Sequence, residues 1–266
     1  MNIKLIASDM DGTLLQNGNQ NITAKMLEII KTLHEKGILF VAASGRQYAN
    51  LYRLFEPVRK DIAFICENGA LVMYQDKILS KTSMDKHIAF KIIEDIRNRE
   101  GCEVQISGEN TTYLIPKSES YINHFKNALK NNYKIIEDPS EIPEDIIKVS
   151  VYEEAGIMEN SGTYFINKWQ DKVKCTVSGF GWLDFVSPSV NKGTALSCLL
   201  EELSITPNEV MAFGDNYNDL EMLSLVKYGY VMNNAVEDIK NRYSYRSNLV
   251  EETLMDVFEL DIKTGF

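Results

Sequence analysis

Three apolar runs in the first 80 residues are bounded by polar residues or glycine, which is typical of buried strands. They are residues 3–8, 38–43 and 62–66. Two segments between them carry apolar side chains at helical spacing: the first lies between Thr23, a capping residue type, and Gly37, and the second covers residues 46–55 before Pro57. This alternation in short steps predicts a parallel sheet with helices on its faces.

The last third of the chain repeats this rhythm. Helices are expected at residues 192–203, 220–226 and 250–258. Strands are expected at residues 210–213 and 228–232. Residues 71–79 alternate around Gln75 and Asp76, as a β-hairpin would. The two ends of the chain therefore predict one α/β domain with a Rossmann-like parallel sheet.

The middle of the chain follows a different pattern. It carries three longer amphipathic helices, expected at residues 87–99, 118–132 and 157–169. Short strands are expected at residues 104–106, 113–115, 147–151 and 173–177. Residues 179–182, Gly-Phe-Gly-Trp, favour a hinge or hairpin, with the mouth of a pocket as the alternative. We therefore expect a discontinuous core domain, residues 1–83 and 184–266, with an α+β domain, residues 84–183, inserted into it.

The charge balance argues against nucleic-acid binding. The chain has 28 Lys+Arg against 38 Asp+Glu, a formal charge of −10, whereas nucleic-acid binders usually present a basic face. No apolar run approaches the roughly 18–20 residues of a membrane span, and the N-terminus lacks the basic start and longer apolar core of a signal peptide. We therefore expect a cytoplasmic protein without a nucleic-acid, membrane or obligate protein partner. A divalent metal ion would allow so acidic a protein to hold an anionic ligand.

The four cysteines are scattered along the chain. They are Cys66, Cys102, Cys175 and Cys198. Because no two of them have the short spacing of zinc ligands, a zinc site is not expected. A disulfide framework is not expected in a chain of this size.

Asp9 and Asp11 directly follow the first predicted strand. Residues two apart point to the same side of an extended chain, so both carboxylates can face one site while Met10 faces away. Gly12 then allows a sharp turn that brings backbone N–H groups to the same place. Two carboxylates in different environments can divide nucleophilic attack and proton transfer between them. An ordinary Asp-Gly turn at the end of a strand is the alternative.

A second acidic group follows the strand predicted at residues 210–213. Asp215 can cap the next helix, and Asp219 lies four residues on, on the same helical face. Carboxylate oxygens crowded at strand ends suit Mg²⁺. An Asn/Asp-rich turn with a helix cap is the alternative, and it explains a single carboxylate more easily than a group of them.

Two further segments could hold an anion. Ser44, Gly45 and Arg46 follow the second predicted strand, where a hydroxyl and exposed N–H groups at a helix start form an anion seat. Lys192 opens a predicted helix, where its charge opposes the helix dipole unless an anion lies nearby. A serine cap and a solvated lysine are the alternatives. All four segments lie at strand ends or helix starts, where parallel sheets collect ligands.

Taken together, these segments resemble the motifs of the haloacid dehalogenase superfamily, and in particular its Cof-type sugar-phosphatase branch. Motif I matches residues 9–14 (DMDGTL), motif II residues 43–46 (ASGR), motif III residues 192–193 (KG) and motif IV residues 214–219 (GDNYND). Residues 67–70 (ENGA) also resemble the segment that follows the third strand in this branch. The resemblance covers essentially the whole chain, including the position of the inserted domain.

This resemblance implies a magnesium-dependent phosphatase that forms an aspartyl-phosphate. Asp9 would be the nucleophile and a metal ligand, and Asp11 the general acid/base, which also binds the metal through its backbone carbonyl. Asp215 would be the third protein ligand of Mg²⁺, and Asp219 would support the metal's shell. The phosphate would be held by Ser44, the Gly45 and Met10 amides, Lys192 and Asn218.

The inserted domain would be a mobile cap that selects the leaving group of a small phosphorylated metabolite. A phosphomutase or other phosphotransferase is the alternative within enzymes, and a phospho-accepting regulatory protein is the alternative outside them. The identity of the substrate and the oligomeric state are not readable from the sequence.

Overall fold

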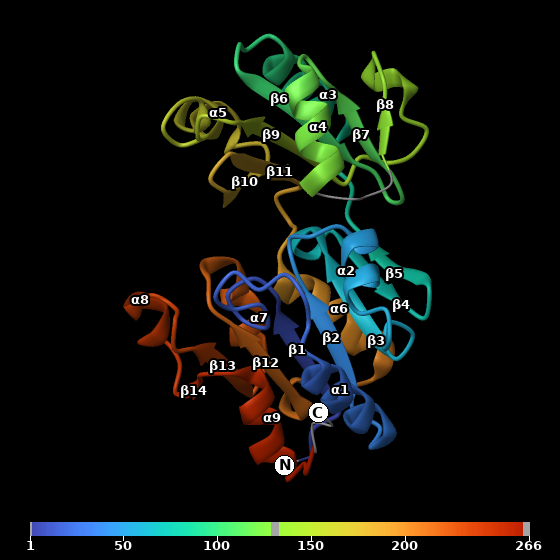
Figure 1. Cartoon of the computed structure of the whole chain (residues 1–266), viewed down its shortest axis with the longest axis vertical. Helices are drawn as coiled ribbons and strands as arrows, with labels where there is room; N and C mark the ends of the chain where they lie inside the picture. Colours follow the sequence, from blue (N-terminus) through green and yellow to red (C-terminus); the bar gives the residue numbers. More distant parts are fainter. Residues whose placement is uncertain (1, 129–132, 263–266) are drawn as a thin grey trace. The chain divides into compact units, whose positions relative to one another are not determined.

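The computed structural model describes residues 2–128 and 133–262. The chain forms two compact units (Figure 1), one made of Met1–Ser80 with Asn191–Phe266 and the other of Lys81–Val190. Within the described residues, no helix is long and apolar enough to cross a membrane.

The first unit contains an eight-stranded sheet in the order β14-β13-β12-β1-β2-β3-β4-β5. The six strands from β14 to β3 pair in parallel, and β4 pairs with β3 antiparallel. The strands are β1 (Leu5–Asp9), β2 (Leu39–Ala43), β3 (Ile62–Cys66), β4 (Leu71–Tyr74), β5 (Lys77–Lys81), β12 (Val210–Gly214), β13 (Tyr228–Met232) and β14 (Tyr245–Ser247). The predicted α/β class and its parallel sheet are confirmed.

Six α-helices accompany this sheet in the described part of the chain. They are α1 (Ala24–Glu35), α2 (Tyr48–Leu54), α6 (Lys192–Leu203), α7 (Leu220–Leu225), α8 (Glu237–Lys240) and α9 (Val250–Phe258). Single 3₁₀ turns lie at Glu67–Gly69, Pro207–Glu209 and Tyr217–Asp219. The predicted N-cap of α1 is confirmed, since the Met26 amide donates to Oγ1 of Thr23 at 3.0 Å.

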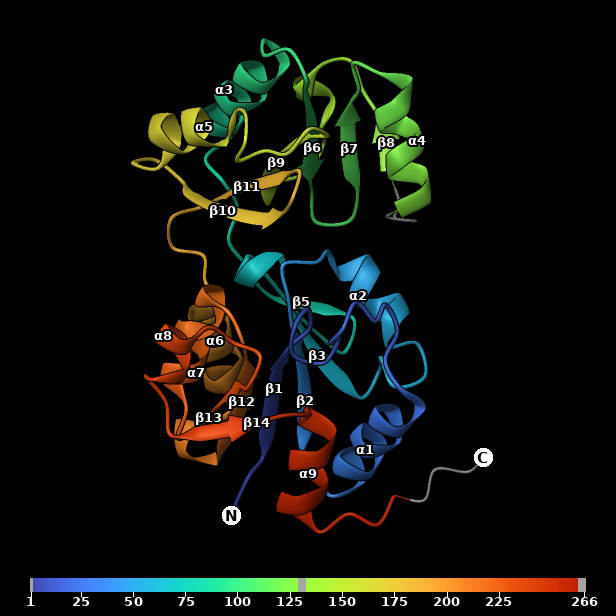
Figure 2. The same cartoon turned by 60° about the vertical axis from the view of Figure 1, so that its left-hand side comes forward.

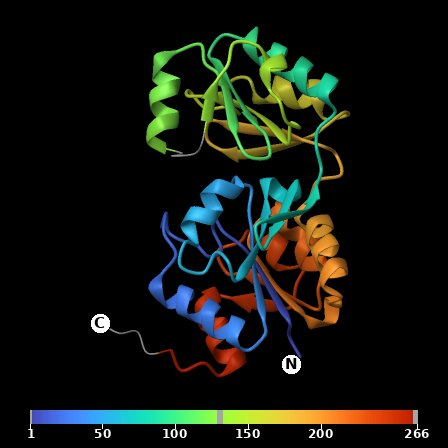
Figure 3. The ribbon, with the colours of Figure 1, turned by 90° about the vertical axis from the view of Figure 1, so that its right-hand side faces the viewer.

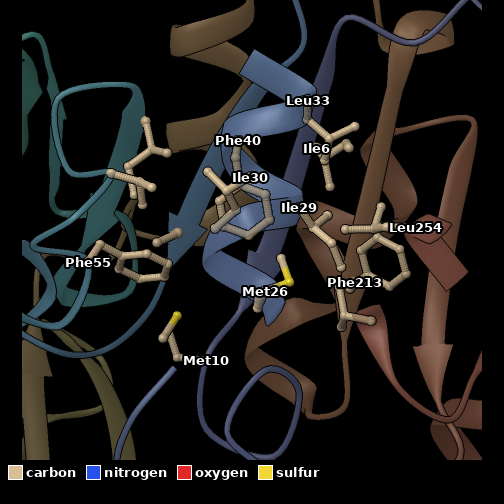
Figure 4. Close-up of a cluster of buried hydrophobic side chains, with 14 of the residues drawn as sticks. Ile6, Met10, Met26, Ile29, Ile30, Leu33, Phe40, Phe55, Phe213 and Leu254 are labelled. Atoms are coloured by element: carbon tan, nitrogen blue, oxygen red, sulfur yellow. The ribbon is translucent and has the colours of Figure 1, made fainter. Parts of the chain in front are cut away.

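Both faces of the sheet are buried, and successive side chains along each strand point to opposite faces. Ile6 of β1 and Phe40 of β2 pack with α1, α2 and α9 (Figure 4). Leu5 and Val41 of the same strands pack with α6, α7 and α8 on the opposite face. Figure 2 shows α1 and α9 side by side on the first of these faces. Burial on both faces explains why these strands are continuous apolar runs.

The second unit contains a six-stranded sheet in the order β10-β11-β9-β6-β7-β8. Its strands are β6 (Cys102–Ser107), β7 (Thr112–Ile115), β8 (Tyr133–Ile135), β9 (Lys148–Glu153), β10 (Lys174–Gly179) and β11 (Trp182–Val186). The helices α3 (Lys86–Arg97) and α5 (Gly162–Trp169) share one apolar cluster with this sheet, and α4 (Glu119–Ala128) packs on Leu114 of β7. Figure 3 shows the ribbon of α4, in green, on the other side of the sheet from α3 and α5. A 3₁₀ turn lies at Pro139–Glu141.

Several bounds differ from those predicted in the middle of the chain. The helix predicted at residues 157–169 begins only at Gly162, because the Gly162 amide donates to the Ile157 carbonyl at 2.6 Å in a turn that precedes it. Residues 129–132 of the helix predicted at 118–132 lie outside the described residues. Residues 179–182 form the turn of the β10–β11 hairpin, as one of the two expectations had it.

The unit boundaries lie at residues 80/81 and 190/191, against 83/84 and 183/184 expected from the sequence. The second difference has a clear cause. β11 was not predicted, and it pairs with β9 and β10, which places it wholly in the second unit.

Candidate active site

The sequence motifs converge at the carboxyl ends of three neighbouring strands in the first unit. Asp9 is the last residue of β1 and pairs with Ala43 of β2, while Ser8 pairs with Phe213 of β12 on the other side. Residues 10–13, 44–46 and 215–219 therefore leave adjacent strands at one edge of the sheet. This is the edge at which open α/β sheets bind ligands.

Lys192 lies between the carboxylates of Asp9 and Asp219. Its Nζ donates to Oδ1 of Asp9 at 2.5 Å and to Oδ1 of Asp219 at 2.7 Å. The side chains of Lys192 and Asp219 are fully buried, and that of Asp9 is 8% exposed. Burial alone would lower the pKa of Lys192, but the negative charges of Asp219 and Asp9 raise it above its ordinary value.

Gly193 allows α6 to bring Lys192 to this place. A Cβ atom at position 193 would lie 2.7 Å from the backbone of Glu221 in α7, so a larger residue would push the two helices apart. The predicted pairing of Lys192 with an anion is therefore met by two carboxylates of the chain itself.

Both oxygens of Asp219 are occupied by protein donors. Oδ1 accepts from Lys192, and Oδ2 accepts from the backbone N–H groups of Asp215 and Asn216 at 3.0 and 3.1 Å. Asp219 thus ties the loop after β12 to the lysine. Such an arrangement suits a residue that orients neighbouring groups.

Asp215 is held by a residue from the first motif. Oγ1 of Thr13 donates to Oδ1 of Asp215 at 2.7 Å. Gly12, with φ of +93°, allows the close approach, since a Cβ there would lie 2.3 Å from Oδ2 of Asp215. Nδ2 of Asn234 donates to the Gly12 carbonyl at 2.8 Å and fixes the turn. Burial raises the pKa of Asp215 above its ordinary value.

The acidic residues at this edge fit a divalent cation. Carboxylate oxygens of Asp9, Asp215 and Asp219 lie within 4.8 Å of one another, and Lys192 supplies one positive charge against these three carboxylates. Burial raises the pKa of Asp9 well above its ordinary value, although the charge of Lys192 opposes that shift. A cation would relieve the repulsion, and an all-oxygen donor set is what Mg²⁺ prefers.

Asp11 points to a different partner. Nε and Nη2 of Arg46 donate to its two oxygens at 2.9 and 2.5 Å. The side chain of Asp11 is 57% exposed, in contrast to that of Asp9. The two carboxylates of the first motif therefore occupy different environments, as a division of labour requires.

Three of the residues expected to hold phosphate, Ser44, Gly45 and Asn218, lie beside Asn68. Nδ2 of Asn218 donates to Oδ1 of Asn68 at 3.1 Å, and a Cβ at Gly45 would lie 3.1 Å from the Asn68 amide. The hydroxyl of the buried Ser44 accepts from the Arg46 amide at 3.1 Å. Met10 places its side chain in the core (Figure 4), as predicted.

Thr13, Arg46 and Asn68 lie within the sequence motifs, but the sequence predicts no individual role for their side chains. Their partners lie on neighbouring strand ends and are far away in sequence. The available signal was that each is a hydrogen-bonding side chain directly beside a residue with a predicted role.

The sequence pattern of the haloacid dehalogenase-like hydrolases matches residues 6–253. Two bacterial relatives carry the name 5-amino-6-(5-phospho-D-ribitylamino)uracil phosphatase. YbjI of Escherichia coli (strain K12) is 26% identical over 264 residues, which cover 99% of this chain and 97% of the relative. YcsE of Bacillus subtilis (strain 168) is 27% identical over 245 residues, which cover 92% of this chain and 90% of the relative.

A solved structure from Eubacterium rectale is similar over almost the whole length of the chain. It has a TM-score of 0.85 and 29% sequence identity, and the alignment covers 96% of this chain and 99% of that chain.

Proposed function

The chain belongs to the haloacid dehalogenase-like hydrolases and is a phosphatase, and we propose that it hydrolyses small phosphate monoesters through a phosphorylated Asp9 with the help of Mg²⁺. The observation that carries this proposal is the buried contact between Lys192 and Asp9, beside the half-buried carboxylate of Asp215. This arrangement combines an attacking carboxylate, a fixed positive charge and hard oxygen ligands at the carboxyl-end edge of the sheet.

The proposed reaction has two displacements at phosphorus. In the first, an oxygen of Asp9 bonds to phosphorus while the bond to the ester oxygen breaks. The ester oxygen keeps the electron pair of the broken bond and receives a proton from Asp11, and the alcohol leaves. In the second, a water oxygen bonds to phosphorus and gives a proton to Asp11. The bond between phosphorus and Asp9 then breaks and inorganic phosphate is released.

The other residues of the site would bind the metal ion and the phosphoryl group. Asp9 and Asp215, with the backbone carbonyl of Asp11, would bind Mg²⁺, which when bound supplies Lewis-acid polarisation of the phosphoryl oxygens. Asp219 supports this group by orienting Lys192 and the loop that carries Asp215. The phosphoryl group would be held by Lys192, the Ser44 hydroxyl, the Met10 and Gly45 amides and the Asn218 side chain.

The proposed substrates are small phosphorylated metabolites such as sugar phosphates. 5-Amino-6-(5-phospho-D-ribitylamino)uracil is a specific candidate, because two relatives that match most of this chain carry its name. We propose that residues 81–190 act as the cap that selects the leaving group. A cytoplasmic location is part of the same proposal.

A phosphate-release assay on the full chain tests this function. Sugar phosphates and the ribityl phosphate above are offered with Mg²⁺ or with a chelator. We expect release of inorganic phosphate that depends on Mg²⁺ and is abolished in Asp9→Asn with unchanged folding. Asp76→Asn, in the exposed β4–β5 turn, is the matched control and should keep full activity. Appreciable turnover by Asp9→Asn would contradict the nucleophile assignment, and conversion of a hexose 1-phosphate to its isomer would favour a mutase.

A further inference from the structure

Arg46 forms a two-point contact with the Asp11 carboxylate. Its Nε and Nη2 donate to the two carboxylate oxygens of Asp11 at 2.9 and 2.5 Å. Exposed ion pairs contribute little to folding stability, and the Asp11 side chain is more than half exposed. A two-point contact between a guanidinium and a carboxylate does, however, fix direction as well as distance.

Arg46 is itself anchored to its surroundings. Its backbone N–H donates to the Ser44 hydroxyl at 3.1 Å, and its carbonyl accepts from the Glu67 amide at 3.1 Å. Nη1 donates to Oδ1 of Asn50 in α2 at 3.3 Å. The backbone and the guanidinium of Arg46 are therefore held in place, so the guanidinium can set the orientation of a neighbouring side chain.

The backbone of Asp11 is fixed, but that does not fix its side chain. The Gly12 amide donates to the Leu15 carbonyl at 3.0 Å, and the Leu15 amide donates to the Met10 carbonyl at 2.7 Å. These bonds close the turn after β1. The carboxylate beyond them projects towards solvent, where several rotamers are accessible.

We propose that Arg46 is a positioning residue that directs the Asp11 side chain for proton transfer to the leaving group. The inference rests on the proposed acid/base role of Asp11. Each oxygen of Asp11 accepts one hydrogen bond from Arg46 and keeps a second lone pair on which the proton can reside. The two-point contact therefore keeps the carboxyl group pointing in the same direction through both steps.

Leaving-group dependence separates this role from a merely structural one. Dinitrophenyl phosphate has a leaving group that departs without a proton, whereas phenyl phosphate has one that needs an acid. The parameter kcat/KM covers events up to departure of the leaving group. For Arg46→Met we expect a loss on phenyl phosphate on the order of 10- to 100-fold. The loss on dinitrophenyl phosphate should stay within about threefold.

Three further variants and one control make the result decisive. Arg46→Lys keeps the positive charge without the two-point contact. It should recover only part of the kcat/KM on phenyl phosphate that Arg46→Met loses. Asn50→Ala should show a smaller loss of the same selective kind. In an Asp11→Asn background, Arg46→Met should have no further effect on phenyl phosphate. Arg242→Gln breaks an exposed ion pair between Asp238 of α8 and Arg242, which follows that helix, and should leave both rates unchanged.

The outcomes distinguish this inference from the function on which it rests. If the wild type turns over neither ester, the proposed function fails and the inference fails with it. If wild type and Asp11→Asn behave as expected but Arg46→Met loses equally on both esters, Arg46 has only a structural role. Unchanged or faster turnover of phenyl phosphate by Arg46→Met also overturns the inference. The ion pair between Arg46 and Asp11 would then not help proton transfer to the leaving group, or would oppose it.

Discussion

Nζ of Lys192 lies 2.5 Å from Oδ1 of Asp9, and neither side chain is appreciably exposed. The two residues are 183 positions apart in sequence and meet because α6 starts where β1 ends. The contact holds the proposed nucleophile in place and sets a positive charge where the transferring phosphoryl group would lie. Its effects on stability and on phosphate binding are therefore linked.

Lys192→Met should destabilise the protein strongly. It would leave Asp9 and Asp219 buried together without their shared cation, and breaking a buried pair in this way costs about 3–5 kcal/mol. Urea unfolding measures the loss. Lys240→Met removes the ion pair between a partly buried lysine and the exposed Glu237 and should cost less than about 1 kcal/mol. Equal stability of the two variants would argue against a buried, charged Lys192.

Thr13→Val should weaken magnesium dependence without removing a proposed ligand. It deletes the hydroxyl that holds Oδ1 of Asp215, and loss of such a supporting contact typically costs about 10- to 100-fold in metal affinity. The measurement is the Mg²⁺ concentration that gives half-maximal activity. Thr32→Val, which removes a hydroxyl on α1 that bonds to the Glu28 carbonyl, is the control. The same magnesium titration for Thr13→Val and wild type would refute a supporting role of Thr13.

Asn68→Gly should weaken binding of inorganic phosphate as a competitive inhibitor. The side-chain amide of Asn68 positions Asn218, and loss of one such bond corresponds to about a fivefold to tenfold change in the inhibition constant. Glycine is chosen because Asn68 has φ of +58°, so the backbone is not strained by the change. Asn17→Gly, at an exposed position with φ of +56°, is the matched control. An unchanged inhibition constant would exclude this role for Asn68.

Asp95→Asn should destabilise the protein at neutral pH. Asp95 accepts hydrogen bonds from Tyr164, Lys168 and Trp169 of α5 at 2.7 to 2.9 Å. Although burial works in the opposite direction, these donors hold its pKa below the ordinary value. We expect a loss of about 1–2 kcal/mol, the scale of one or two charge-assisted hydrogen bonds.

This stabilisation has a defined dependence on pH. Because the pKa of Asp95 is lower in the folded chain than in the unfolded one, its contribution is complete above about pH 4, the ordinary value for aspartate. It is lost as the pH falls through the folded value. The difference in melting temperature between wild type and Asp95→Asn should therefore shrink in acid. A constant difference from neutral pH to acid would contradict the assignment.

Much of the core could be predicted from the sequence because its strands are buried on both faces. β3, α6, β13 and α9 have the predicted bounds. The difference at α2 is informative. This helix was expected to begin at Arg46 but begins at Tyr48, after an extended Gln47. Arg46 and its neighbours instead form the loop that serves the site, so local helix propensity gave way to tertiary contacts.

The contacts of the site could not be predicted in the same way. Thr13 meets Asp215 across 202 positions, and Asn68 meets Asn218 across 150. These pairs depend on the order of strands in the sheet, in which β12 lies beside β1 and β2 on its other side. Sequence spacing reports which residues follow a strand, but strand order decides which of them meet.

Chemical trapping at Asp9 tests the central claim most directly. Asp11→Asn should slow attack by water and allow the phosphorylated enzyme to accumulate in the presence of Mg²⁺ and dinitrophenyl phosphate, whose leaving group departs without a proton from Asp11. Borohydride converts an acyl phosphate on an aspartate to homoserine, which mass spectrometry can locate. We predict homoserine at position 9, formed only when substrate is present. Substrate-dependent modification at another residue, or turnover by the wild type with Asp9 unmodified in both proteins, would contradict the proposed mechanism.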